Sequence, residues 1–145
     1  MARILVVYGP NLNLLGEREP DVYGHETMED ISARLRDAAT RDGVSLEVFH
    51  SNSEGAIIDR LHAARHEVDA VVLNAGALTH YSLALRDAIA GIRIPVVAVH
   101  MSNTAARGAF RRRDVLAPVC AGVITGFGTN SFLLGLRAAI DLVRR

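Results

Sequence analysis

Lysine is absent from this 145-residue sequence, and all 16 of its basic residues are arginine. The absence excludes catalysis through a Schiff base on a lysine amine. It also excludes a Walker-type phosphate loop, which requires its lysine. Cysteine occurs only once, at Cys120, so the chain can form no internal disulfide and has no secretory disulfide framework.

Neither sign of charge predominates, because 16 acidic residues balance the 16 basic ones. A neutral chain without an aromatic and basic platform is not expected to bind nucleic acid or an anionic membrane. No apolar run approaches the roughly 20 residues that span a bilayer, and residues 1–8 lack the separate parts of a signal peptide. We therefore expect a cytoplasmic protein without nucleic-acid or membrane partners.

Short β-branched runs alternate with longer segments of helical periodicity over residues 1–145, which we predict to be a single domain. The predicted strands are Ile4–Tyr8, Leu46–Phe49, Ala70–Asn74, Val96–His100 and Val119–Thr125. The predicted helices are Thr27–Arg41, Ser53 to about His66, about His80 to Ala90, and about Asn130 to Arg144. This alternation predicts an α/β fold, a flavodoxin-like three-layer αβα sandwich whose five-stranded parallel sheet has the order 2-1-3-4-5.

Polar side chains follow three of the predicted strands, at the edge of the sheet where such folds bind ligands. The segment after the first strand, about residues 9–25, is much longer than the usual connection of about 2–6 residues, which is typical of a lid or binding loop. The candidate functional residues from all three connections are Asn11, Arg18, Tyr23, Asn74, His80, His100, Met101, Ser102 and Arg111.

Each of these residues has a structural alternative. Asn11 could be a turn residue, Tyr23 a loop anchor and His80 a helix cap. The run Arg111–Arg113 could be a solvated face, and Cys120 is expected in the core of a strand. Coincidence of the polar residues at one edge of one sheet favours function.

Two other patterns carry less weight. His62 and His66 stand four residues apart on a predicted helix, but no catalytic glutamate lies between them and no third ligand is evident, so we expect no metal site. The Gly126-Phe-Gly128 segment lacks the third glycine of a dinucleotide loop. It is interpreted as a tight turn, with backbone N–H groups that could be offered to an anion.

Taken together, the motifs resemble those of type II 3-dehydroquinate dehydratases over essentially the whole chain. They are Gly-Pro-Asn-Leu-Asn-Leu-Leu-Gly at 9–16, Arg18-Glu-Pro20, Tyr23-Gly24, Ser-Asn-Ser-Glu-Gly at 51–55, Asn74-Ala-Gly76, Thr79-His80, Ala-Leu-Arg-Asp at 84–87, His-Met-Ser-Asn at 100–103, Arg107, Phe110-Arg111 and Gly126-x-Gly128. The resemblance implies reversible dehydration of 3-dehydroquinate to 3-dehydroshikimate, in the shikimate pathway of aromatic amino acid biosynthesis or in quinate metabolism. It further implies no metal, no cofactor and a homo-oligomer, a dodecamer built of trimers.

The resemblance also implies roles for the candidate residues in an anti elimination through an enolate. Tyr23 would be the base and His100 the general acid, while Asn11 would stabilise the enolate through a water. Free tyrosine has a pKa of about 10, so Arg18 is the expected source of the charge that favours tyrosinate. Asn74, His80, Met101, Ser102 and Arg111 would bind substrate, and Asp87 would reach the site of a neighbouring subunit.

Three departures from the family pattern concern the general acid and its surroundings. Ala98 stands where the family usually has glutamate, on the same strand face as His100, and Asp114 stands where serine is usual. Gly108 and Ala109 replace two acids. Glu54 or Asp87 are the expected substitute partners of His100. A divergent or weakened paralogue, or a non-catalytic protein that binds a related cyclic polyhydroxy acid, is therefore the alternative.

Overall fold

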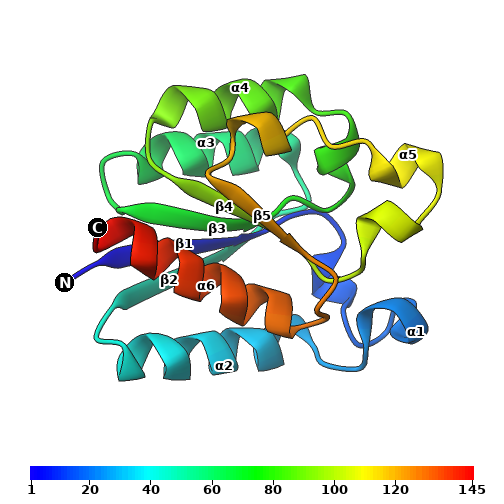
Figure 1. Ribbon diagram of the computed structural model, residues 1–145, viewed down its shortest axis with the longest axis horizontal. Coiled ribbons are helices and arrows are strands. Elements are labelled where there is room, and N and C mark those ends of the chain that lie inside the picture. The colour runs from blue at the N-terminus through cyan, green and yellow to red at the C-terminus, as the bar shows by residue number, and fades with distance from the viewer.

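The computed structural model describes residues 1–145 as a parallel five-stranded sheet covered by helices on both faces (Figure 1). The strand order is β2-β1-β3-β4-β5, with all pairs parallel, which confirms the predicted fold class. The strands are β1 (Arg3–Tyr8), β2 (Ser45–His50), β3 (Ala70–Asn74), β4 (Val96–His100) and β5 (Gly122–Thr125). The main helices are α2 (Met28–Arg41), α3 (Glu54–Ala64), α4 (Leu83–Ile92) and α6 (Asn130–Val143).

Alternation along the central strands divides the core into two layers. Ile4, Val6 and Tyr8 of β1 pack with α2 and α6, whereas Leu5 and Val7 pack with α3 and α4. Full burial of such a side chain is worth about 1.5–3 kcal/mol. The Tyr8 hydroxyl bonds to the Ser32 hydroxyl at 2.9 Å, and burial raises the pKa of Tyr8 to about 12, which makes it a core residue without acid–base use.

Side-chain caps fix where the helices begin. Thr27 and Asp30 form a reciprocal capping box at the start of α2. The Ser53 hydroxyl accepts a hydrogen bond from the Ala56 backbone N–H, so the predicted start of the second helix at Ser53 is confirmed. These caps satisfy backbone N–H groups in the first turns of α2 and α3.

Two predicted boundaries are wrong. The helix predicted to begin near His80 begins instead at Leu83, because the Ser82 hydroxyl caps α4 by accepting a hydrogen bond from the Leu85 backbone N–H. His80 itself ends a 3-10 turn, η2 (Gly76–His80). The last strand begins at Gly122 and not at Val119, because Pro118 lies in another 3-10 turn, η4 (Ala117–Val119). Cys120 therefore precedes the strand and is half-buried, and burial raises the pKa of its thiol to about 12.

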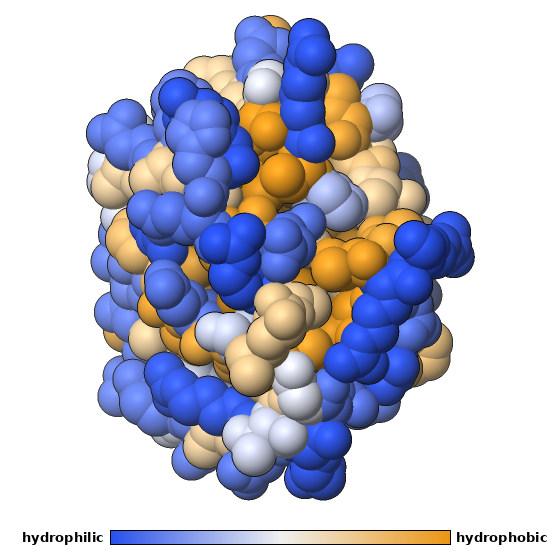
Figure 2. Space-filling model, turned by 90° about the vertical axis from the view of Figure 1, so that its left-hand side faces the viewer, coloured by the Kyte–Doolittle hydropathy of each residue, from blue (hydrophilic) through white to orange (hydrophobic).

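The connections at the two ends of the sheet differ. Short elements gather at the carboxyl ends of the strands: η1 (Leu12–Leu14), α1 (Pro20–Tyr23), η3 (Thr104–Ala106) and α5 (Ala109–Arg112), with η2 (Figure 1). The opposite face, which bears the termini, presents hydrophilic side chains interspersed with apolar groups (Figure 2). No helix combines the length and apolar character that a membrane crossing requires.

Candidate active site

A pocket of about 200 Å³ lies beyond the carboxyl ends of β1, β3 and β4. Its lining joins three segments that are far apart in the sequence: the loop after β1, the η2 turn, and the loop after β4. The pocket brings together nine of the ten predicted site residues: Asn11, Arg18, Tyr23, Asn74, His80, His100, Met101, Ser102 and Arg111. Asp87 is the exception, because it is exposed on α4 beside a separate hollow between α3 and α4.

The first segment is anchored where it leaves β1. A side chain at Gly9 would meet the Ala75 backbone, because a Cβ there would lie 2.7 Å from the Ala75 carbonyl carbon. Asn11 has a φ of +70° and its backbone N–H donates to Asn52 Oδ1 at 2.8 Å. Asparagine tolerates this left-handed conformation better than most residues. The backbone of Asn11 is thus occupied, and its side chain lines the pocket.

Two arginines surround the Tyr23 side chain at the end of α1. The Arg107 Nη1 donates a hydrogen bond of 2.8 Å to the Tyr23 hydroxyl. The Arg18 guanidinium lies over the ring, with its carbon 5.2 Å from the ring centroid, and pairs with Glu19 at 3.4 Å. The cation in contact with the phenol oxygen is therefore Arg107, whereas the sequence prediction had assigned this effect to Arg18.

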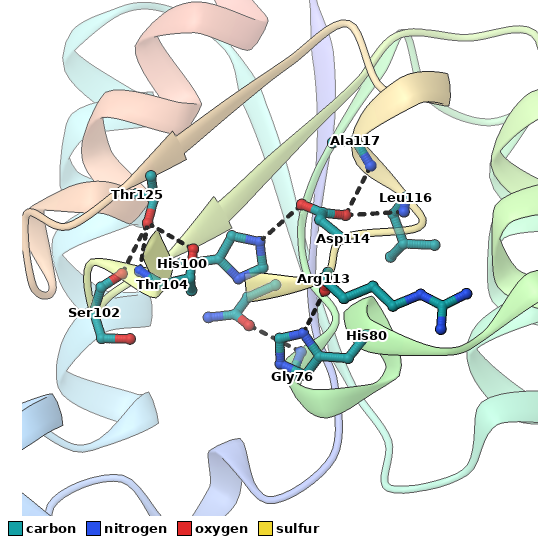
Figure 3. A network of polar contacts seen from close by, with 11 residues as sticks. Gly76, His80, His100, Ser102, Thr104, Arg113, Asp114, Leu116, Ala117 and Thr125 are labelled. Atoms are coloured by element: carbon teal, nitrogen blue, oxygen red, sulfur yellow. Dashed lines mark hydrogen bonds and ion pairs between the residues drawn. The ribbon is translucent and has the colours of Figure 1, made fainter. Parts of the chain in front are cut away.

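Asn74 and His80 stand at the end of β3 and in η2. Asn74 Oδ1 accepts from the Gly76 backbone N–H at 3.0 Å, which leaves its NH₂ group as a donor for a ligand. His80 Nδ1 lies 2.7 Å from the backbone carbonyl oxygen of Arg113 (Figure 3). A carbonyl only accepts, so Nδ1 carries a proton and Nε2 is available to the pocket.

His100 ends β4 and is 8% exposed. Its Nε2 is buried without a hydrogen-bond partner, and Asp114 Oδ2 lies 3.8 Å away (Figure 3). The predicted partners are wrong, because Glu54 accepts a hydrogen bond from the Ser82 hydroxyl and Asp87 is on the outer surface of α4. The acidic residue beside His100 is Asp114, which the sequence had marked only as a departure from the family pattern.

The Asp114 carboxylate is fixed by the backbone that follows it. Its Oδ1 accepts from the N–H groups of Leu116 and Ala117 at 2.9 and 2.8 Å. Burial tends to raise the pKa of Asp114, but His100 and these two hydrogen bonds outweigh burial and hold the pKa below its ordinary value. The group is therefore a carboxylate at neutral pH.

The backbone N–H groups of the Gly126–Gly128 turn, before α6, all have acceptors within the chain. The N–H groups of Gly126 and Gly128 donate to the His100 and Met101 carbonyl oxygens, and that of Phe127 donates to the Ser131 hydroxyl. The possibility that this turn offers its N–H groups to an anion is therefore wrong, and the turn instead holds the chain after β4. No cluster of three or more His, Cys, Asp or Glu side chains is placed to hold a metal ion.

Known proteins with similar sequences show to which family this chain belongs. The family model described as dehydroquinase class II matches residues 2–140. The chain belongs to the class II dehydroquinase family. The 3-dehydroquinate dehydratase of Desulforudis audaxviator is 60% identical over 99% of this chain and 95% of its own length. That of Pelotomaculum thermopropionicum is 53% identical over 97% of each chain.

Solved structures agree with this assignment. The type II dehydroquinase from Butyrivibrio crossotus superposes with a TM-score of 0.92 at 40% identity, covering 99% of this chain and 98% of that one. A 3-dehydroquinate dehydratase-like protein from Bifidobacterium longum gives a TM-score of 0.75 at 28% identity, with full coverage of both chains. The class II dehydroquinase fold thus extends over the whole sequence.

The pocket of this class II dehydroquinase suits a small anion that undergoes proton transfer. Its lining includes Arg18, Arg107 and Arg111 and contains no acidic side chain. A phenol oxygen bonded to a guanidinium and a histidine backed by a carboxylate are ordinary participants in acid–base catalysis. Both open into the same cavity, so one ligand can meet the two groups together.

Proposed function

We propose that this protein is a 3-dehydroquinate dehydratase, which converts 3-dehydroquinate reversibly to 3-dehydroshikimate in the shikimate pathway. Family membership and the names of its relatives support the reaction. The observation that carries the proposal for this chain is the pairing of Tyr23 and Arg107 in the same pocket as His100.

In the proposed mechanism, Tyr23 removes the proton next to the ketone of 3-dehydroquinate. The Arg107 guanidinium donates a hydrogen bond to the phenol oxygen, and Arg18 places a second cation over the ring. Asn11 stabilises the enolate through a bound water. His100 then protonates the departing hydroxyl, which completes an anti elimination without a cofactor.

The remaining polar groups bind the substrate. Arg111 and His80 meet its carboxylate and hydroxyls, and the Asn74 amide and the Ser102 hydroxyl supply further hydrogen bonds. Met101 is buried and contributes an apolar wall. Fixed donors of this kind hold the reacting carbon near the Tyr23 oxygen, which contributes to the rate by positioning.

The assembly and the first loop are also part of the proposal. Residues 9–25 act as a lid that carries Arg18 and Tyr23 onto the substrate. Trimers assemble into a dodecamer, and Asp87, exposed on α4 and remote from the pocket of its own chain, reaches the site of a neighbouring subunit.

Ultraviolet absorbance tests the reaction directly, because the product has a conjugated enone and 3-dehydroquinate does not. Purified protein mixed with 3-dehydroquinate should give a rising signal, and the Tyr23→Phe variant should give none while it still binds a substrate analogue. Binding without turnover by the unmutated, folded protein would instead support the non-catalytic alternative.

A further inference from the structure

One ring nitrogen of the proposed general acid lacks a partner. His100 Nε2 is buried and forms no hydrogen bond, although buried polar atoms rarely stay unpaired. Asp114 Oδ2, 3.8 Å away, is about 1 Å beyond a charge-assisted hydrogen bond. Catalytic hydrogen bonds are often long before a ligand binds, and a small rotation of the ring would shorten this one.

Asp114 is held so that it faces His100. Two backbone N–H groups, from Leu116 and Ala117, fix its Oδ1 and leave Oδ2 directed at the ring (Figure 3). The next residue, Val115, donates its N–H to the Thr79 carbonyl oxygen at 2.9 Å. This hydrogen bond ties the segment that bears Asp114 to the η2 turn, which forms one wall of the pocket.

The same short segment contacts both pocket histidines. The Arg113 carbonyl oxygen bonds to His80 Nδ1, and Asp114 faces His100 Nε2. Both groups are acceptors. The Arg113 carbonyl oxygen requires a proton on His80 Nδ1, and a carboxylate beside His100 Nε2 would favour a proton there.

The pocket lining of this chain contains three arginines, Arg18, Arg107 and Arg111, and no acidic side chain. Within this chain, Asp114 is therefore the carboxylate that lies beside the His100 ring. The proposed contribution of Asp87 comes from a neighbouring subunit.

We propose that Asp114 is the positioning residue of His100: it holds a proton on Nε2, orients the ring, and leaves Nδ1 to protonate the leaving hydroxyl. This inference rests on the proposed dehydration. During the step, Nδ1 gives its proton to the departing oxygen as the carbon–oxygen bond breaks, and Nε2 keeps its proton against Asp114. The imidazolium becomes the neutral ring, and the hydroxyl leaves as water.

The variant Asp114→Asn replaces the hydrogen-bond acceptor that faces His100 Nε2 with a donor, and it changes the shape of the side chain little. The N–H groups of Leu116 and Ala117 still require an oxygen, so the new amide turns its NH₂ group toward His100. A donor there requires Nε2 to accept, which moves the proton of the neutral ring to Nδ1. The variant Asp114→Ser removes the carboxylate and keeps an oxygen for the backbone. Asp37→Asn, at an exposed position of α2, is the matched control.

Solid-state ¹⁵N NMR of histidine-labelled protein at mildly alkaline pH shows which ring nitrogen carries the proton, and it does not depend on activity. The His100→Ala spectrum identifies the His100 signals among those of the six histidines. The expected result is a proton on Nε2 in the unmutated protein and on Nδ1 in Asp114→Asn. A proton on Nδ1 in the unmutated protein would overturn the inference, whether or not the variant folds.

Steady-state kinetics supply the second readout. We expect kcat to fall by about 10²–10⁴ in Asp114→Asn, less in Asp114→Ser, and not in Asp37→Asn, with KM changed far less than kcat. An Asp114→Asn protein with unmutated kcat would also overturn the inference. Absence of turnover in the unmutated protein would instead refute the proposed function, and the NMR result would still show whether Asp114 selects the protonated nitrogen.

Discussion

Arg107 donates a 2.8 Å hydrogen bond to the Tyr23 hydroxyl across 84 residues of sequence. The same Nη1 lies 3.4 Å from the Ser102 hydroxyl, so one guanidinium connects the loop after β1 with the loop after β4. The proposed base is therefore positioned by the segment that also follows the proposed acid. Movement of the proposed lid, residues 9–25, and assembly of the proposed catalytic groups would therefore be linked through this contact.

Replacement of Arg107 tests that link. Hydrogen bonds to charged groups contribute about 1.5–3 kcal/mol, so we expect Arg107→Ala to lower kcat by roughly 10- to 150-fold in the ultraviolet assay. Arg107→Lys should recover only part of the loss, because a compact ammonium does not reproduce the planar fork. Arg112→Ala, exposed on neighbouring α5, is the control and should leave kcat unchanged. Full activity of Arg107→Ala would show that Arg18 alone supports Tyr23.

Much of the fold was predictable because its signals are local. Continuous apolar runs identified β3 and β4 with their observed bounds. Apolar periodicity with acidic residues in the first turn identified the start of α2, and Ser53 identified the start of α3. The errors at His80 and Val119 arose where a short polar or cyclic residue, Ser82 or Pro118, interrupts an apolar pattern. Hydrophobic periodicity alone does not separate a 3-10 turn from the helix or strand beside it.

The site was predictable in its members and less so in its contacts. Parallel strands deliver the residues after β1, β3 and β4 to one edge, and nine predicted residues do meet there. The contacts of Arg107 and Asp114 depend on how the loop after β4 returns across η2, which no local pattern encodes. Asp114 was identified from the sequence as a departure from the family pattern, but its contact with His100 was not predicted.

A glutamate at position 98 should not improve the enzyme. Ala98 is 3% exposed and shares a strand face with His100. Asp114 already supplies a carboxylate near the ring, so Ala98→Glu would add like charge and excess volume, at a cost of about 1–3 kcal/mol. We expect kcat no higher than that of the unmutated protein and a lower free energy of unfolding. A rise in kcat would mean that Ala98 is a defect that Asp114 does not compensate.

Acid should weaken the contact between Glu26 and the start of α6. Hydrogen bonds from Thr129 and then Arg34 hold the pKa of Glu26 below its ordinary value of 4.5. A lowered folded-state pKa contributes stability that is complete above the ordinary value and is lost as pH falls through the lower one. Because both charged side chains are partly exposed, we expect Glu26→Gln to cost only about 0.2–1 kcal/mol at neutral pH.

Urea unfolding at several pH values measures this contribution. The difference between Glu26→Gln and the unmutated protein should shrink as pH falls below the ordinary glutamate value. Glu17→Gln, at an exposed residue without an ion pair, should show no comparable trend. A difference that stays constant down to acidic pH would mean that the charge of Glu26 does not stabilise the fold.

Gly135 sets how closely α6 approaches the sheet beneath the site. A Cβ at this position would lie 2.5 Å from Val99 Cγ1 and 3.1 Å from Val72 Cγ1, so Gly135→Ala must displace the helix or the strands. Overpacking of this kind costs about 1–3 kcal/mol, more than the roughly 0.5–1 kcal/mol that alanine gains over glycine inside a helix. Gly91→Ala in α4 is the matched control, because no atom lies within 4 Å of the added Cβ, and it should be neutral or slightly stabilising. Denaturant unfolding of both variants separates the two effects. If Gly135→Ala proved as stable as Gly91→Ala, the interface between α6 and Val99, the residue before His100, would have room for a methyl group, and Gly135 would not set how closely α6 approaches the sheet.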